Sequence, residues 1–146
     1  MQKLLIGLAA AVLFAVPADA QRPPREESPA PREVLEAFGA GTSDDELARA
    51  VAAAHAFPLG SLQNPVRLGG PEGAHAYLAR LRCANGLAPK VGVRSAAGVG
   101  AFGSVVNSYA LDCGAAAPGK VALVMDMYHE ENRENRAPAG FRIEAR

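Results

Sequence analysis

The chain has 146 residues, 49% of them hydrophobic, and its 15 basic and 15 acidic side chains leave no net charge at pH 7. A neutral chain lacks the basic surface with which proteins bind nucleic acid or anionic lipid. It also has no tryptophan and few aromatic residues, and therefore no stacking platform for bases or sugars. We expect no nucleic-acid partner. The length suits one domain with a hydrophobic core.

The first twenty residues have the pattern of a secretory signal peptide. Lys3 precedes an apolar run from Leu4 to Val16, and the small residues Ala18 and Ala20 mark a cleavage site. An uncleaved anchor is the alternative, but the run is shorter than the roughly 20 residues that a span requires. No later segment is long and apolar enough to cross a bilayer. We therefore expect a periplasmic or secreted protein with no stable membrane span after cleavage.

Residues 21–31 are rich in proline and charge and poor in apolar side chains. Such a segment cannot bury enough surface to offset the entropy of ordering it, which predicts a disordered linker. The remaining residues, 32–146, are predicted to form a single small domain. Arginine outnumbers lysine twelve to three and alanine is abundant, a composition typical of GC-rich bacterial genomes.

The domain is predicted to begin with a helical pair over about residues 32–57. Apolar residues within 32–39 share one helical face. The second helix begins at a capping box with Ser43 as the N-cap and Glu46 at the N3 position. Pro58 restricts the residue before it and ends this helix.

From about residue 64 the apolar period falls toward two, which predicts a small antiparallel β meander over about 64–145. A helix beginning at Pro71 is the alternative to the second strand, but we favour the strand because its apolar residues alternate. In the third strand, Val91 and Val93 are expected to point inward. With the helical pair packed on this sheet, the fold class is α+β. The expected strands cover residues 64–68, 76–83, 90–96, 104–113, 121–128 and 141–143.

The sequence contains two cysteines, Cys83 and Cys113. In an oxidising compartment such a pair most simply forms a disulfide. Closing a loop of this size stabilises a fold by about 3–4 kcal/mol in the chain-entropy model. A metal site is the alternative, but no CxxC or CxxH spacing supports it. We therefore predict one disulfide.

The stretch Asp-Met-Tyr-His-Glu at 126–130 is the densest group of chemically active side chains. Its candidates for metal ligands or acid/base groups are Asp126, His129 and Glu130. Five positions of strand cover about 13 Å, and alternation points His129 away from the two carboxylates, so these side chains do not converge by spacing alone. We interpret the stretch as a solvated strand end. A metal site, acid/base catalysis and partner contact are the alternatives.

Basic residues dominate the sequence between positions 67 and 94, where Glu72 is the single acid. In the predicted strand, Arg80 and Arg82 project from one face and could form a fork for the carboxylate or phosphate of an anion or acidic partner. An ordinary solvated sheet face is the simpler interpretation.

No catalytic signature is present. The chain has no GxSxG, and Gly98-Val99-Gly100-Ala101-Phe102-Gly103 lacks the Lys-Ser/Thr of a phosphate loop. The predicted role of this glycine-rich stretch is a sheet bend. We expect no cofactor and a non-enzymatic exported domain that binds a protein or cell-envelope partner. The alternatives are a binder of a small molecule, anion or metal ion, and a small secreted hydrolase whose site assembles only in space.

Overall fold

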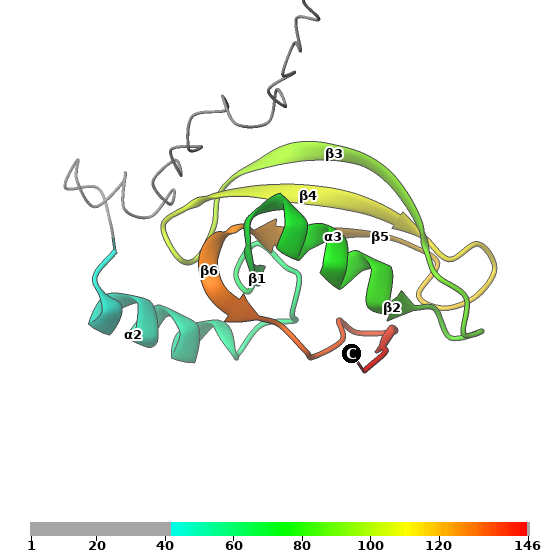
Figure 1. Ribbon diagram of the computed structural model, residues 1–146, viewed down its shortest axis with the longest axis horizontal. Coiled ribbons are helices and arrows are strands. Elements are labelled where there is room, and N and C mark those ends of the chain that lie inside the picture. The colour runs from blue at the N-terminus through cyan, green and yellow to red at the C-terminus, as the bar shows by residue number, and fades with distance from the viewer. Residues whose placement is uncertain (1–41, 146) are drawn as a thin grey trace, which may run out of the picture.

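The structure is a computed structural model that describes residues 42–145. The predicted signal peptide, linker and helix over 32–39 lie outside these residues. The described part is α+β, with two helices and a mostly antiparallel sheet (Figure 1). Its elements are α2 (Asp44–Ala54), β1 (Val66–Gly69), α3 (Gly70–Arg80), β2 (Leu81–Arg82), β3 (Lys90–Val99), β4 (Val105–Asp112), β5 (Lys120–Asp126), β6 (Tyr128–Arg133) and β7 (Arg142–Ile143).

The capping box predicted for the second helix is confirmed. The Glu46 N–H donates to Ser43 Oγ at 3.4 Å, and the Ser43 N–H donates to the Glu46 carboxylate at 3.1 Å. These two bonds satisfy backbone donors that the first turn of a helix leaves free. The helix ends at Ala54, before Pro58, and lies beside the sheet rather than across it (Figure 1).

The strand predicted over residues 76–83 is wrong, because most of that segment belongs to α3 (Figure 1). Pro71 stands in the first turn of α3, where a missing N–H costs nothing. Ala74, Tyr77 and Leu78 form its buried face, with the spacing of three and four that a helix requires. Tyr77 and Leu81 fit both the period of a strand and that of a helix, so alternation over so short a segment was ambiguous.

The large sheet has the strand order β3-β4-β5-β1-β6. Strands β3, β4 and β5 form the antiparallel meander that the sequence predicts. The sheet is not a pure meander, however, because β1 inserts beside β5 in parallel and separates it from β6. Strands β2 and β7 form a separate two-stranded pair near the C-terminus.

The core lies between α3 and one face of the large sheet. In β4, Tyr109 and Leu111 are buried in this core while Ala110 between them is exposed. Side chains alternate across a strand, so Ala110 marks the opposite face, here named the outer face. Residues from α3 and the sheet that share the core include Val66, Leu68, Tyr77, Leu78, Tyr109, Leu111, Leu123 and Met125.

Strand β3 is confirmed where it was predicted and is longer, reaching Val99. Val91 pairs with the core residue Leu111 and so lies on the inward face, but the burial expected for Val91 and Val93 is wrong, because their side chains are 50% and 80% exposed. The reason is the position of the helix. Helix α3 packs against β1 and β6, at the other side of the sheet, and leaves the β3 border uncovered.

Cys83 and Cys113 form the predicted disulfide, with their Cα atoms 5.8 Å apart. This separation lies within the usual range for bonded cysteines. Cys83 follows β2 and Cys113 follows β4, so the bond fastens the end of the helical segment to the far end of the meander. Neither helix in residues 42–145 has the length and hydrophobicity that crossing a membrane requires.

Candidate functional site

The carboxylate of Asp126 is fully buried, so the interpretation of residues 126–130 as a solvated strand end is wrong. Strand β5 ends at Asp126, and β6 begins at Tyr128. The Tyr128 N–H donates to Asp126 Oδ1 at 3.1 Å, which closes a local turn. The chain therefore reverses where the sequence pattern predicted a continuing strand.

This reversal places His129 against Asp126. His129 Nε2 lies 3.2 Å from Asp126 Oδ2, and Ser104 Oγ donates a hydrogen bond to the same oxygen. Nε2 is buried and makes no hydrogen bond of standard geometry, so it lies beside the Asp126 carboxylate without bonding to it. Burial raises the pKa of Asp126, but its contacts with His129, Ser104 and the Tyr128 N–H outweigh burial and hold the pKa below its ordinary value.

The loop from Gly100 to Ser104 closes over this pair. Phe102 is 5% exposed, and its ring packs edge to face against His129 with the two ring centroids 5.5 Å apart. The Arg67 guanidinium carbon lies 5.5 Å from the centroid of the Phe102 ring. A Cβ on Gly100 would come within 2.6 Å of Val106, so only glycine fits this close approach. The glycine-rich stretch is thus a tight turn that lays Phe102 onto the sheet.

The order of these groups does not match nucleophilic catalysis. In a triad, histidine lies between the nucleophile and the acid and takes the proton of the serine. Here Asp126 lies between Ser104 and His129, and Ser104 donates to the carboxylate. The arrangement therefore does not activate Ser104, and it gives the hydrolase alternative no support.

Glu130 does not join Asp126 and His129, because it is exposed on β6. Within residues 42–145, no three side chains of His, Cys, Asp or Glu gather closely enough to hold a metal ion. Zinc sites in proteins use three or four such ligands. Asp126 and His129 instead fasten the Phe102 loop to the β5–β6 turn. Sequence reasoning missed Ser104, which is 22 positions from Asp126 and gives no local signal.

A second buried carboxylate anchors the segment after β6. Glu134 is 8% exposed, and its carboxylate accepts hydrogen bonds from the Arg136 guanidinium at 3.0 and 2.7 Å. Burial raises the pKa of Glu134, but these bonds outweigh it and lower the pKa. The Tyr77 hydroxyl donates to the Arg136 carbonyl at 2.8 Å, which ties the segment to α3. These groups satisfy one another.

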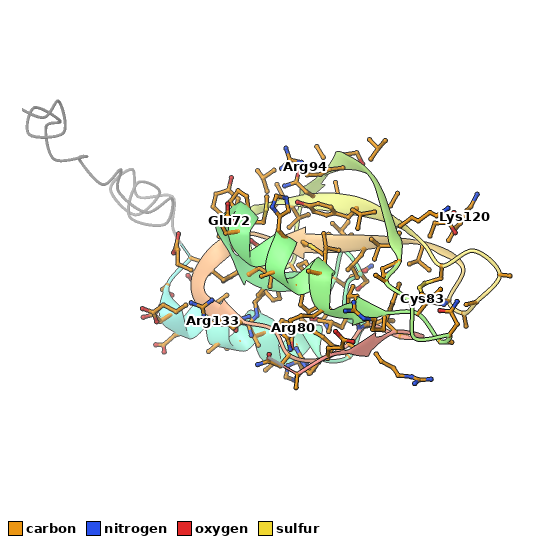
Figure 2. The ribbon with its side chains drawn as sticks, turned by 45° about the vertical axis from the view of Figure 1, so that its right-hand side comes forward. Glu72, Arg80, Cys83, Arg94, Lys120 and Arg133 are labelled. Carbon is orange, nitrogen blue, oxygen red and sulfur yellow. A yellow bond between two sulfur atoms is a disulfide. The ribbon has the colours of Figure 1, made fainter. Side chains whose placement is uncertain are left out.

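Arg80 and Arg82 do not form the predicted fork, because they are not on one strand face. Arg80 ends α3, as Figure 2 shows, and its Nε donates to the Glu144 carbonyl at 2.8 Å. Arg82 lies in β2, and its Nε donates to the Glu144 carboxylate at 2.9 Å. Arg82 also donates to the carbonyls of Ala79 and Leu81. Both guanidinium groups are therefore engaged by the chain itself.

Arg82→Glu is expected to lower the free energy of unfolding by about 1–2 kcal/mol, because it sets two carboxylates against each other and removes partly buried hydrogen bonds. Chemical denaturation measures this loss. Arg133→Glu is the control, since it makes the same charge change at an exposed site on β6. Equal effects of the two substitutions would mean that Arg82 does not hold the C-terminal segment.

The most exposed element of the described chain is β3. All of its ten residues except Ala97 are exposed, and Val91, Val93 and Val99 among them are apolar. Strand β4 is its single hydrogen-bonded neighbour within residues 42–145, so one backbone edge of β3 is open. It carries no proline and no acidic side chain. Lys90, Arg94 and two register shifts against β4 are the features of β3 of the kind that proteins use to block an edge.

Beside this edge the outer face has a shallow hollow of about 470 Å³. Ala110 pairs with Ala122, and a Cβ on Gly92 would lie 3.4 Å from that of Ala110, so three small residues form its floor. The neighbouring cross-strand row contains two lysines around one acid, Lys90, Asp112 and Lys120.

Similarity to known proteins does not assign a function to these surfaces. No family model, no curated protein and no solved structure matches the chain. The α+β architecture alone does not fix a function either, because one fold supports many activities. What the chain does must follow from its own side chains and surfaces.

Proposed function

We propose that the mature protein is an exported binding domain, periplasmic or secreted, which takes an extended segment of a partner protein as an added strand along β3. The predicted signal peptide and the disulfide support export, since disulfides persist in oxidising compartments. The partner is a protein or a protein component of the cell envelope.

The open backbone edge of β3 carries this proposal. An exposed edge presents unpaired N–H and C=O groups, and binding domains use such an edge to pair with an extended peptide. Ten residues extend over roughly 30 Å at the usual rise of a strand, a length that suits a partner segment of similar size. Exposed valines along the strand add apolar contact.

The contacts of the candidate site residues favour this function over the alternatives. Ser104 and His129 both contact the carboxylate of Asp126, and Arg80 and Arg82 donate hydrogen bonds to the C-terminal segment. These groups therefore stabilise the fold that presents β3. The open edge, by contrast, has backbone donors and acceptors that the described chain leaves unpaired.

Panning a display library of random peptides about 12 residues long against the purified protein tests the proposal. Enriched peptides are expected to slow amide exchange along β3. Val93→Pro is expected to weaken them at least about tenfold, because proline removes an amide and blocks the edge. Val93 lies in the register shift between Val91 and Arg94 and has no Cα partner in β4, so proline there leaves the paired positions of the ladder unsubstituted.

Val93→Ala is the matched control, because it removes the side chain and keeps the amide. Near-normal binding by Val93→Ala together with weak binding by Val93→Pro would identify backbone pairing as the cause. Protection away from β3, or equal binding by the wild type and both variants, would refute strand addition. Circular dichroism and a thermal melt establish that each variant is folded.

A further inference from the structure

The charged side chains of β3 indicate which kind of peptide would bind along its open edge. The inference in this section rests on the proposed function. No aspartate or glutamate occurs from residue 73 to residue 111, and the two charged residues of β3 are Lys90 and Arg94. Neither of these side chains forms an ion pair within the described residues, and Arg94 extends into solvent from β3 (Figure 2). The open edge therefore carries a net positive charge, although Lys90 lies across from Asp112, which also contacts Lys120.

The two cations lie on opposite faces of the sheet. Lys90 pairs with Asp112, which belongs to the outer face with Ala110. Arg94 pairs with Tyr109, whose side chain belongs to the face that carries α3. An added strand would meet one cation on each face. Because successive side chains of a strand point to opposite faces, its carboxylates would be an odd number of positions apart.

A second copy of the chain fits this border poorly. Pairing two β3 strands would place four cations, Lys90 and Arg94 of both copies, on two strands that carry no carboxylate. Like charges across neighbouring strands are destabilising. The border thus favours a partner of opposite charge over its own copy.

We infer that β3 recognises an extended acidic peptide with carboxylates on both faces and a small apolar side chain on the outer one. Lys90 and Arg94 attract the carboxylates. The floor of Gly92, Ala110 and Ala122 leaves space for the apolar side chain beside the edge, within the hollow of about 470 Å³. Backbone pairing supplies the strand geometry, and the two cations supply the specificity.

Three labelled peptides test this inference by fluorescence anisotropy. They share an alternating Thr/Val sequence of about ten residues and differ at two positions, which hold Glu, Gln or Lys. The Glu peptide is expected to bind the purified protein about tenfold more tightly than the Lys peptide, with Gln between them, and added salt should reduce the difference. Arg94→Glu leaves Lys90 and the new carboxylate on β3 with no net charge, so the difference between the Glu and Lys peptides is expected to disappear. Arg133→Glu, an equal charge change on exposed β6, should leave it unchanged.

The results separate this inference from the proposed function. If all three peptides bind with equal affinity and Val93→Pro abolishes this binding, strand addition is supported and recognition of an acidic peptide is refuted. Failure of all three to bind would count against both, while the library panning would still decide strand addition by itself. A dimer in analytical ultracentrifugation that Val93→Pro dissociates would show that a second copy occupies the edge, and would overturn the inference.

Discussion

Asp126→Ala is expected to lower the free energy of unfolding by about 3–5 kcal/mol, the usual cost of removing one member of a buried charged network. The carboxylate is fully buried and accepts hydrogen bonds from Ser104 and from the Tyr128 N–H. Its loss leaves these donors and His129 without their partner inside the fold. Urea denaturation of the wild type and the variant measures the difference.

Glu130→Ala is the matched control within the same five residues. Glu130 is exposed on β6, so its removal is expected to change stability by less than about 0.5 kcal/mol. A small effect of Asp126→Ala, close to that of Glu130→Ala, would mean that residues 126–130 behave as a solvated strand end. The contacts around the Phe102 loop would then not contribute to stability.

The same carboxylate makes stability depend on pH in a defined direction. The pKa of Asp126 is lower in the folded protein than its ordinary value of 3.8, so its contribution is complete above that value. As the pH falls below about 4, the unfolded chain takes up the proton first, and the contribution is lost as the pH passes through the lowered folded-state pKa. The stability gap between wild type and Asp126→Ala should therefore narrow in acid.

Local signals in the sequence predicted some elements well. The capping box at Ser43 and Glu46 starts α2 because both of its hydrogen bonds form within four residues. Strands β4 and β5 lie where alternation predicted them, and the disulfide joins the two cysteines of the chain. The cap and the two strands depend on residues that are neighbours in the sequence. The disulfide was predictable because two cysteines can pair in only one way.

Features set by contacts distant in sequence were not predicted. Ser104 and Phe102, which contact Asp126 and His129 beside the turn, come from another part of the chain. Residues 76–80 belong to α3, whose buried face packs into the core, although the alternation over 76–83 was equally compatible with a strand.

The exposure of β3 has the same origin. The sequence contains strands but not their order, and β3 is an edge because β1 inserts at the other side, between β5 and β6. The helix that covers the core follows β1 directly and stays near it. Strand β3, whose valines predicted a half-buried strand, therefore has an exposed edge. The surface proposed for binding thus follows from topology rather than from any motif.

Replacing both cysteines by alanine is expected to lower the free energy of unfolding by about 3–4 kcal/mol, because the bond between Cys83 and Cys113 closes a loop with a sequence separation of 30. For a domain of this size the melting temperature should fall by roughly 10–15 °C. Alanine is chosen because Cys83 is 1% exposed and a serine hydroxyl would be buried there. Thermal melts followed by circular dichroism measure the change.

Reduction of the wild type provides the control for this substitution. With excess dithiothreitol, the wild type should melt close to the double variant, and the variant should not respond to the reagent. The same bond fastens the turn before β3 to the end of β4, so its loss should also weaken peptide binding at β3. An unchanged melting temperature in both experiments would mean that packing alone holds these segments together. The disulfide would then no longer support the proposal that the protein is exported to an oxidising compartment.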